Sequence, residues 1–488
     1  MAASRVMGTG VPQRSSREAT NPRRAKVPTV NGPWQKKQRR YAMSENAMAT
    51  DMTRISEKAR REPELVFTSL YHHICDVDNL RACYDTLEAN KATGVDGVTK
   101  AEYGENLEAN LQDLSERLKR MGYCPGLKRR SYIPKPGNAK GRPLGISNFE
   151  DKIVELATKR TLEPIYEAVF ESSSHGYRPE CNQHKCLDAL GRTIQQQKVS
   201  YVVEADVQSF FDKVNWDWMI KFLRHRIGDE RVIRLIIRML KSGIMEDGLV
   251  RATEEGTPQG SILSPLLSNI YLHYVLDLWF SQRVRRHCRG EAYYFRFADD
   301  FLACFQYEND AKRFRLELGQ RLEAFGLKLA EDKTHCIGFG RFARDNARKR
   351  GEKPKEFTFL GFTHYCGKTR KCAFKVKRRT SRKKLGLSLS KFKDWAKKVR
   401  NVLSIGDMIR AARLRVIGHL SYYAITDNLK WCRNYVYCAT RILYKWLNRK
   451  SQRKAYNTEG FNQVLSLLDW PTVTIRKDLN PFRRAEAY

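Results

Sequence analysis

The sequence contains no apolar run that approaches the roughly 20 residues a helix needs to cross a bilayer. Its first residues have no apolar signal core, and no long amphipathic segment could anchor the chain at a membrane surface. We therefore expect a protein that has no membrane partner.

Cysteine is present, but it lacks the spacing that zinc sites require. None of the 12 cysteines belongs to a C-x-x-C pair, the closest cluster is "CNQHKC", and neither Cys nor His follows Cys438. Structural zinc usually needs two closely spaced ligand pairs. We therefore expect reduced, mostly buried cysteines in a cytoplasmic protein, and no structural zinc.

Acidic residues are in deficit. The sequence has 54 Asp and Glu against 90 Lys and Arg, which gives a formal net charge of +36 and a pI near 9.8. A charge of this sign and size predicts a polyanionic partner, and nucleic acid is the usual one. Attraction to an anionic membrane surface is the competing interpretation, but nothing in the sequence provides an anchor for it.

The hydrophobic pattern predicts an α+β fold in several parts. Strand-like and helix-like patterns mix up to about residue 365, whereas from Thr380 onward apolar residues recur at helical spacing among basic and aromatic ones. The expected parts are a disordered basic tail (1–45), a mixed region with a helical N-terminal piece (46–365), a helical region (366–460) and a weakly patterned C-terminal tail (461–488).

The stretch "YYFRFADDFLACF" places two adjacent aspartates, Asp299 and Asp300, inside a run that otherwise resembles a buried strand. Burying two carboxylates that repel each other is costly unless a cation joins them. A tight turn at Ala298–Asp300 would carry both carboxylates to the tip of a hairpin, where they could hold a divalent metal. An ordinary Asx-rich surface turn explains this stretch equally well when it is taken alone.

A third carboxylate follows another strand-like run. Asp206 comes just after the β-branched stretch at Tyr201–Val203. Three carboxylates can hold two Mg²⁺ ions about 4 Å apart for phosphoryl transfer, and the backbone carbonyl of Val207 could assist. By itself, Asp206 is better explained as a helix N-cap or a strand-end residue.

Two further stretches combine turn residues with polar side chains. In "GTPQGSILSPLLSNIYL", Ser264–Pro265 fits a helix N-cap followed by proline, and Gly260 would let the backbone approach a ligand closely. In "IPKPGNAKGRPLGI", Lys135 and Arg142 flank a turn and could clamp phosphate oxygens from one side of a hairpin. A plain loop and a chance pair of basic residues are the alternatives.

Taken together, these stretches resemble the blocks of one polymerase family, in the right order. "RFADD" resembles the YADD box of reverse transcriptases, "DVQSFFD" their first aspartate box and "TPQGSILSPLLSNIYL" their template-side loop. "NKATGVDGV", "SSSHGYRP" and "GHLSYYAITDN" resemble blocks of group II intron reverse transcriptases of the bacterial type, the last of them in maturase domain X. The resemblance covers roughly residues 60–455. It implies a right-hand polymerase of fingers and palm, followed by an α-helical thumb (domain X).

The resemblance also implies a role for each matching residue. Asp206, Asp299 and Asp300 would be catalytic and hold two Mg²⁺ ions, and Phe211 would lie under the sugar and reject ribonucleotides. A core position is the alternative for Phe211, and an exposed structural lysine is the alternative for Lys333. The other expected roles are triphosphate binding by Lys135 and Arg142, contact with the template–nucleotide pair by Gln259 and Gly260, protonation of pyrophosphate by Lys333, and placement of the primer end by Phe359, Leu360 and Gly361.

Two departures from the family pattern affect what we expect. Phe297 replaces the usual tyrosine of the YADD box, which loses a hydroxyl but keeps the ring. No Cys or His ligands follow Cys438, so we expect no C-terminal HNH endonuclease.

The expected activity is RNA-directed DNA synthesis together with assistance to splicing and retromobility in the bacterial cytosol or nucleoid. The expected partners are group II intron RNA, an RNA template with a DNA primer, dNTPs and target DNA. Basic helices, among them one expected over 375–384, would bind the intron RNA. A splicing-only maturase, a domesticated reverse transcriptase in DNA repair or phage defence, and an RNA-copying polymerase remain alternatives.

Overall fold

The structure is a computed structural model that describes residues 51–135, 138–251, 254–450 and 455–482. The basic tail expected over residues 1–45 lies outside the described residues. Among the described residues, no helix is both long enough and apolar enough to span a membrane. All 12 cysteines are free, and six of them are buried, so the expectation that most would be buried is met by only half.

An N-terminal group of helices packs beside a four-stranded sheet that we call the fingers sheet. Its strands are β1 (Lys128–Lys135), β2 (Asn138–Ile146), β4 (Ile244–Glu246) and β5 (Leu249–Arg251), in the order β2-β1-β4-β5. The helices are α2 (Tyr71–Cys75), α3 (Val77–Thr86), α4 (Lys100–Glu105), α5 (Leu107–Lys119) and α6 (Phe149–Glu167). The expected helical N-terminal piece is confirmed.

A second four-stranded sheet, which we call the palm sheet, lies at the centre of the chain. Its strands are β3 (Tyr201–Ala205), β6 (Ala292–Phe297), β7 (Asp300–Phe305) and β8 (His335–Gly338), all antiparallel, in the order β6-β7-β3-β8. Alternate side chains of β3 enter two different cores: Val203 shares one with the N-terminal helices and α13 (Glu308–Glu323), and Val202 shares the other with α7 (Gln183–Gln196). The palm sheet is therefore covered on both faces.

The remaining elements of the palm region connect these layers. They are α8 (Phe210–Lys213), α9 (Trp216–Arg224), α10 (Glu230–Lys241), α11 (Ser264–Leu272), two π-helical turns (His273–Asp277 and Phe280–Val284), α12 (Arg285–His287), a 3₁₀ turn (Glu331–Lys333) and α14 (Ala343–Lys349). The expected cap at Ser264 is wrong. Leu263 takes the N-cap position, while Ser264 is the first helical residue and donates its hydroxyl to the Pro258 carbonyl at 2.8 Å.

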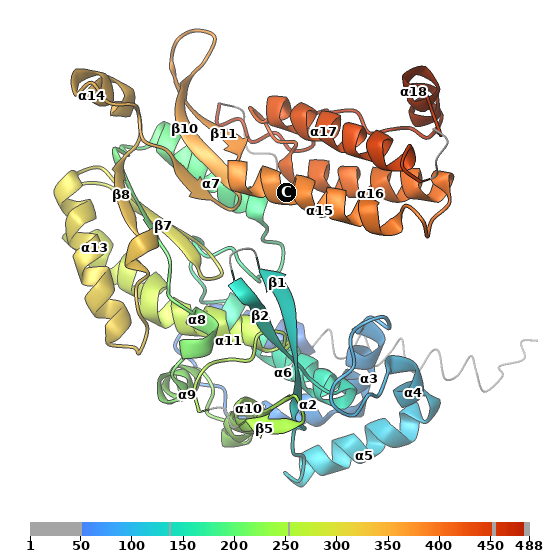
Figure 1. Ribbon diagram of the computed structural model, residues 1–488. Helices are drawn as coiled ribbons and strands as arrows, with labels where there is room; N and C mark the ends of the chain where they lie inside the picture. Colours follow the sequence, from blue (N-terminus) through green and yellow to red (C-terminus); the bar gives the residue numbers. More distant parts are fainter. Residues whose placement is uncertain (1–50, 136–137, 252–253, 451–454, 483–488) are drawn as a thin grey trace, which may run out of the picture.

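A three-stranded sheet links the palm to a helical bundle. The strands β9 (Phe357–Phe359), β10 (Phe362–Lys368) and β11 (Phe374–Thr380) are ordered β11-β10-β9 and share a core with α7. The bundle consists of α15 (Arg382–Val399), α16 (Ile405–Tyr423), α17 (Leu429–Leu447) and α18 (Thr458–Leu467). In Figure 1 the α15–α17 bundle lies at the top, the fingers sheet and the N-terminal helices lie below, and the palm joins them on the left.

Three expectations about this region need correction. Residues 375–380 belong to a strand rather than a helix: they pair with β10, and every second side chain from Val376 onward is buried. The helix begins only after Ser381, whose hydroxyl accepts from the Lys384 amide. The boundary expected at 365/366 falls inside β10. The segment 461–488 is not a tail throughout, since α18 enters it and Leu479, 1% exposed, is buried in the core that α7 and β10 share.

Candidate active site

The two adjacent aspartates lie at the tip of the β6–β7 hairpin, as predicted. Phe297 pairs with Asp300, so Ala298 and Asp299 form the connecting turn. Ala298 has φ +58°, in the left-handed region that residues with a side chain rarely adopt. The turn therefore needs support from its surroundings.

That support comes from a buried arginine. The guanidinium of Arg296 is fully buried; it donates to both carboxylate oxygens of Asp277 at 2.8 and 2.5 Å. It also donates to the Ala298 carbonyl at 3.1 Å and to the side-chain oxygen of Asn269 at 2.8 Å. The Asn269 amide in turn donates to the carbonyl of Gly176, whose Cα faces the turn so closely that an added Cβ would lie 2.1 Å from the Ala298 nitrogen. These contacts fix the turn that carries Asp299.

The third aspartate joins the pair through the sheet. Strand β3 runs antiparallel to β7 with Ala205 opposite Phe301, so continuing this register by one residue places Asp206 beside Asp300. The ammonium group of Lys333 donates to the Asp206 carboxylate at 2.6 Å. Residues from three distant segments of the sequence thus converge at one end of the palm sheet: Asp206, the pair Asp299 and Asp300, and Lys333.

The electrostatics of this end of the sheet are those of crowded carboxylates. The surrounding protein displaces water and, with the charges of Asp299 and Asp206, raises the pKa of Asp300 to about 6. Loss of hydration, and then Asp206, likewise raises the pKa of Asp299. The hydrogen bond to Asp206 raises the pKa of Lys333. A site that holds negative charge against mutual repulsion favours a cation.

A fourth carboxylate at this site was not anticipated. Glu204 lies two residues before Asp206 on the same face of β3, and loss of hydration, with smaller effects of Asp300 and Asp206, raises its pKa to about 7. The two-residue period of a strand could have identified it once Asp206 was assigned to a strand end.

The donor set fits a hard divalent cation. The converging side chains offer only carboxylate oxygens, the ligands that Mg²⁺ prefers, and Asp206 already takes a cationic partner in Lys333. As the described residues stand, however, no three His, Cys, Asp or Glu side chains are close enough together to hold one metal ion. The carboxylates would therefore need to rotate toward an ion. Val207, expected to contribute its carbonyl, is buried and forms an antiparallel bridge with Leu329.

A groove of about 1130 Å³ runs from the aspartates to the helical bundle. Its lining includes Asp206, Asp300 and Lys333 together with Phe359, Leu360 and Gly361. Leu360 and Gly361 form a tight turn with φ +47° and +80°, and the Leu360 carbonyl accepts a hydrogen bond from the Tyr422 hydroxyl at 2.8 Å. The three residues expected to place a primer end are thus brought to the same groove as the carboxylates.

A second hollow, of about 500 Å³, lies between α8 and the fingers sheet. Phe211, which is half-buried, and Gln259 both line it. Gly260, with φ +108°, does approach a backbone closely, but this backbone is that of Gly145 in β2: an added Cβ would lie 3.0 Å from the Gly145 carbonyl oxygen. Gly260 is therefore explained by its close packing against β2, whereas the sequence suggested a close approach to a ligand.

The expected phosphate clamp lies on the β1–β2 hairpin. Lys135 ends β1, with its side chain outside the described residues, and Arg142 lies in β2 opposite Ile133. The charge of Arg142 acts to lower the pKa of Asp299, so the two side chains lie within electrostatic reach of each other.

Comparison with known proteins agrees with this geometry. Residues 133–364 match the family described as reverse transcriptase (RNA-dependent DNA polymerase). The group II intron-encoded protein LtrA of Lactococcus lactis subsp. cremoris is 36% identical over 231 residues, which are 46% of this chain and 38% of LtrA. Protein YkfC of Escherichia coli K12 is 39% identical over 204 residues, which are 40% of this chain and 52% of YkfC.

A more distant relative is the putative COX1/OXI3 intron 1 protein of Saccharomyces cerevisiae. It is 27% identical over 308 residues, which are 53% of this chain and 36% of the yeast protein. The chain spans about half or less of the length of these relatives. The resemblance to reverse transcriptases is confirmed for residues 133–364.

Proposed function

Residues 133–364 are a reverse transcriptase domain related to those of group II intron-encoded proteins, and on this premise we propose that the chain is an RNA-directed DNA polymerase. The observation that carries the proposal is the convergence of Asp206 with Asp299 and Asp300 at one end of an antiparallel sheet. A decayed polymerase would have no reason to keep three carboxylates in so unfavourable a place.

Asp206, Asp299 and Asp300, with the Val207 carbonyl, would hold two Mg²⁺ ions. Such ions lower the pKa of the primer 3′-hydroxyl and neutralise the triphosphate and its leaving group. The protein's own contribution is to hold the carboxylates at the sheet end, and the anchored turn of Ala298 does this for Asp299. Lys333 stays protonated beside Asp206 and would give a proton to the departing pyrophosphate.

The substrate would be a dNTP paired with an RNA template. The ring of Phe211 would exclude a ribose 2′-hydroxyl, and Gln259, in the same hollow, would contact the template–nucleotide pair. Lys135 and Arg142 would bind the triphosphate. Phe359, Leu360 and Gly361 would hold the primer end in the groove that leads from the carboxylates to the bundle.

We further propose that the chain binds a group II intron RNA, assists its splicing and takes part in its insertion into target DNA. The net charge of +36 and the matched intron-encoded relatives support an RNA partner. Twelve free cysteines suit the reducing bacterial cytosol in which this would occur.

Primer extension on an RNA template, with a DNA primer, dNTPs and Mg²⁺, tests the polymerase. Asp299→Asn should reduce extension to background while RNA affinity, measured separately, stays at the wild-type level. Asp217→Asn is a matched control, because Asp217 is an exposed aspartate on α9 outside both hollows, and it should extend normally. Wild-type extension by Asp299→Asn would remove this residue from the mechanism, and no extension by the wild-type protein would overturn the proposal.

A further inference from the structure

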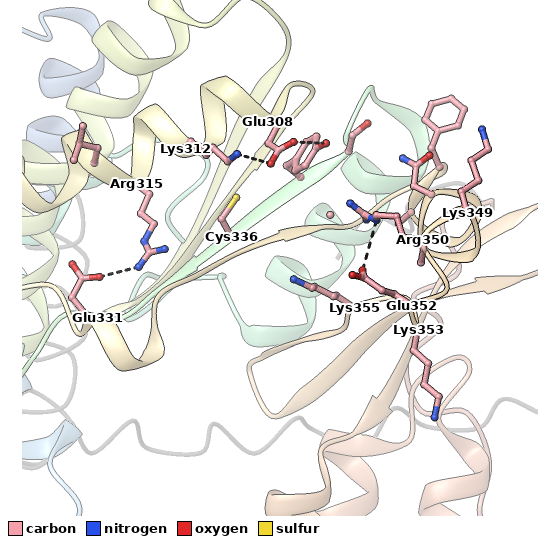
Figure 2. A pocket seen from close by; sticks show the side chains of 18 of the residues that line it. Glu308, Lys312, Arg315, Glu331, Cys336, Lys349, Arg350, Glu352, Lys353 and Lys355 are labelled. Atoms are coloured by element: carbon pink, nitrogen blue, oxygen red, sulfur yellow. Dashed lines mark hydrogen bonds and ion pairs between the residues drawn. The ribbon is translucent and has the colours of Figure 1, made fainter.

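A second large groove, of about 1040 Å³, runs along the outside of the palm. It lies at the free edge of β8, between α13 and the segment from α14 to β9, and shares no lining residue with the catalytic groove. Figure 2 shows its two walls: Lys312 and Arg315 on α13, and Lys349, Arg350 and Lys355 opposite. Nothing in the proposed polymerase mechanism uses it.

The charge of this groove is not balanced. Lys312, Arg315 and Arg350 form ion pairs with Glu308, Glu331 and Glu352, as the dashed lines in Figure 2 mark. The other three cations of the lining are Lys349, Lys353 and Lys355, all exposed. Among the described residues, no carboxylate forms an ion pair with any of them.

The groove continues at both ends into smaller hollows. One of them shares Tyr201 and Phe342 with it and reaches Tyr307; the other shares Lys353 and reaches the β10–β11 hairpin. Along the described lining of the three hollows, ten Lys or Arg side chains face five Glu side chains. The result is a continuous basic track rather than an isolated pocket.

Two large aromatic rings are exposed on this track. Phe342 is 59% exposed and Tyr307 is 48% exposed. Exposed rings beside unpaired lysines are the combination that binds unpaired nucleotides, since rings stack on bases while ammonium groups contact phosphates. An acidic peptide would use the lysines but would leave the rings without partners.

We propose that this track, from Tyr307 through Phe342 to Lys353, is a second nucleic-acid surface that binds a single-stranded segment of RNA while the catalytic groove is occupied. The choice of RNA rests on the proposed function, because the intron RNA is the partner that would still be present when a primer and template fill the catalytic groove. The track itself does not depend on polymerase chemistry.

Removal of the unpaired lysines tests the electrostatic part of this proposal. The probe is a short fluorescein-labelled oligouridylate, whose affinity is measured over a range of salt concentrations. The triple variant Lys349→Gln/Lys353→Gln/Lys355→Gln should lower the slope of log affinity against log salt by about 2, at roughly 0.7 for each phosphate contact. Primer extension on a short template should remain unchanged, which separates failure of this proposal from failure of the polymerase.

A matched triple variant controls for net charge. Lys58→Gln/Lys119→Gln/Lys241→Gln removes three exposed lysines from the N-terminal helices and α10, outside the track. It should leave the slope unchanged. An equal fall in both variants would mean that overall charge alone binds the RNA, and would overturn the proposal.

The aromatic part has its own test. Phe342→Ala should weaken oligouridylate binding about 5- to 150-fold, the range expected for one lost base stack. Photo-crosslinking of a 4-thiouridine-containing oligouridylate to the wild-type protein should label Phe342 or Tyr307. Crosslinks confined to the catalytic groove, or equal binding of the matching DNA oligonucleotide, would contradict the assignment of this track to RNA.

Discussion

Replacing Asp277 by leucine tests whether the buried ion pair holds the hairpin that carries Asp299 and Asp300. Asp277 and Arg296 are both 0% exposed, and two hydrogen bonds join them. Losing Asp277 would leave the Arg296 cation buried without its counter-charge, which costs about 3–5 kcal/mol. This is a large fraction of the roughly 5–15 kcal/mol that stabilises a typical domain. The thermal midpoint should fall by on the order of 10 °C.

The double variant Asp277→Leu/Arg296→Met separates stability from positioning. With both charges gone, the unpaired cation disappears and most of the lost stability should return. The Ala298 carbonyl would still lack its donor, however, so the strained turn would lose a contact that favours its left-handed backbone. We therefore expect the double variant to be stable but to extend primers at least tenfold more slowly.

Thermal unfolding followed by circular dichroism measures the first effect, and primer extension at a temperature where each variant is folded measures the second. Glu230→Gln is the control, because its ion pair with Arg224 is about half exposed and should contribute less than about 1 kcal/mol. An unchanged midpoint in Asp277→Leu would refute the energetic argument. Wild-type extension by the double variant would show that the network stabilises the palm without positioning Asp299.

Three further predictions concern the same site. Gly176→Ala should reduce extension at least tenfold, because the added Cβ would strike the Ala298 backbone. Gly319→Ala is the control: no atom lies within 4 Å of its added Cβ, so it should be neutral or slightly stabilising. Thermal midpoints and extension rates check both variants. Asp300→Asn should abolish extension, yet it should raise the metal-free thermal midpoint at pH 8 and leave it unchanged at pH 4. The pKa of Asp300 is raised to about 6, so ionising this carboxyl costs stability as the pH rises through that value. A lower midpoint for the variant at pH 8 would contradict this. Phe211→Val should allow ribonucleotide incorporation while keeping dNTP use, as measured by competition between rNTP and dNTP, and unchanged selectivity would return Phe211 to a purely structural role.

Local sequence determined a good part of this protein. The strand-like run around Asp299 and Asp300 predicted a hairpin with a tight turn, and the β-branched run before Asp206 predicted a strand end, because strand and turn preferences depend on neighbouring residues. The helical spacing beyond Thr380 predicted the bundle. The excess of Lys and Arg over acidic residues predicted a polyanionic partner without any knowledge of the fold.

The error over residues 375–380 shows where local patterns mislead. The run of basic residues was taken as part of a helix. It forms a strand because β10 pairs with it, and the alternate burial of its side chains follows from that pairing. The reason for Gly260 was also hidden, since the backbone that it approaches belongs to Gly145, more than a hundred residues earlier.

What only the tertiary structure decided is which distant groups meet. Lys333 reaches Asp206, Arg296 is neutralised by Asp277 rather than exposed, and Glu204 joins the carboxylates of the groove. The basic track outside the palm likewise depends on α13 and the α14 segment lying on opposite sides of β8. These pairings follow from strand register and from the packing of two cores, and such long-range contacts leave no periodic trace in a sequence read one segment at a time.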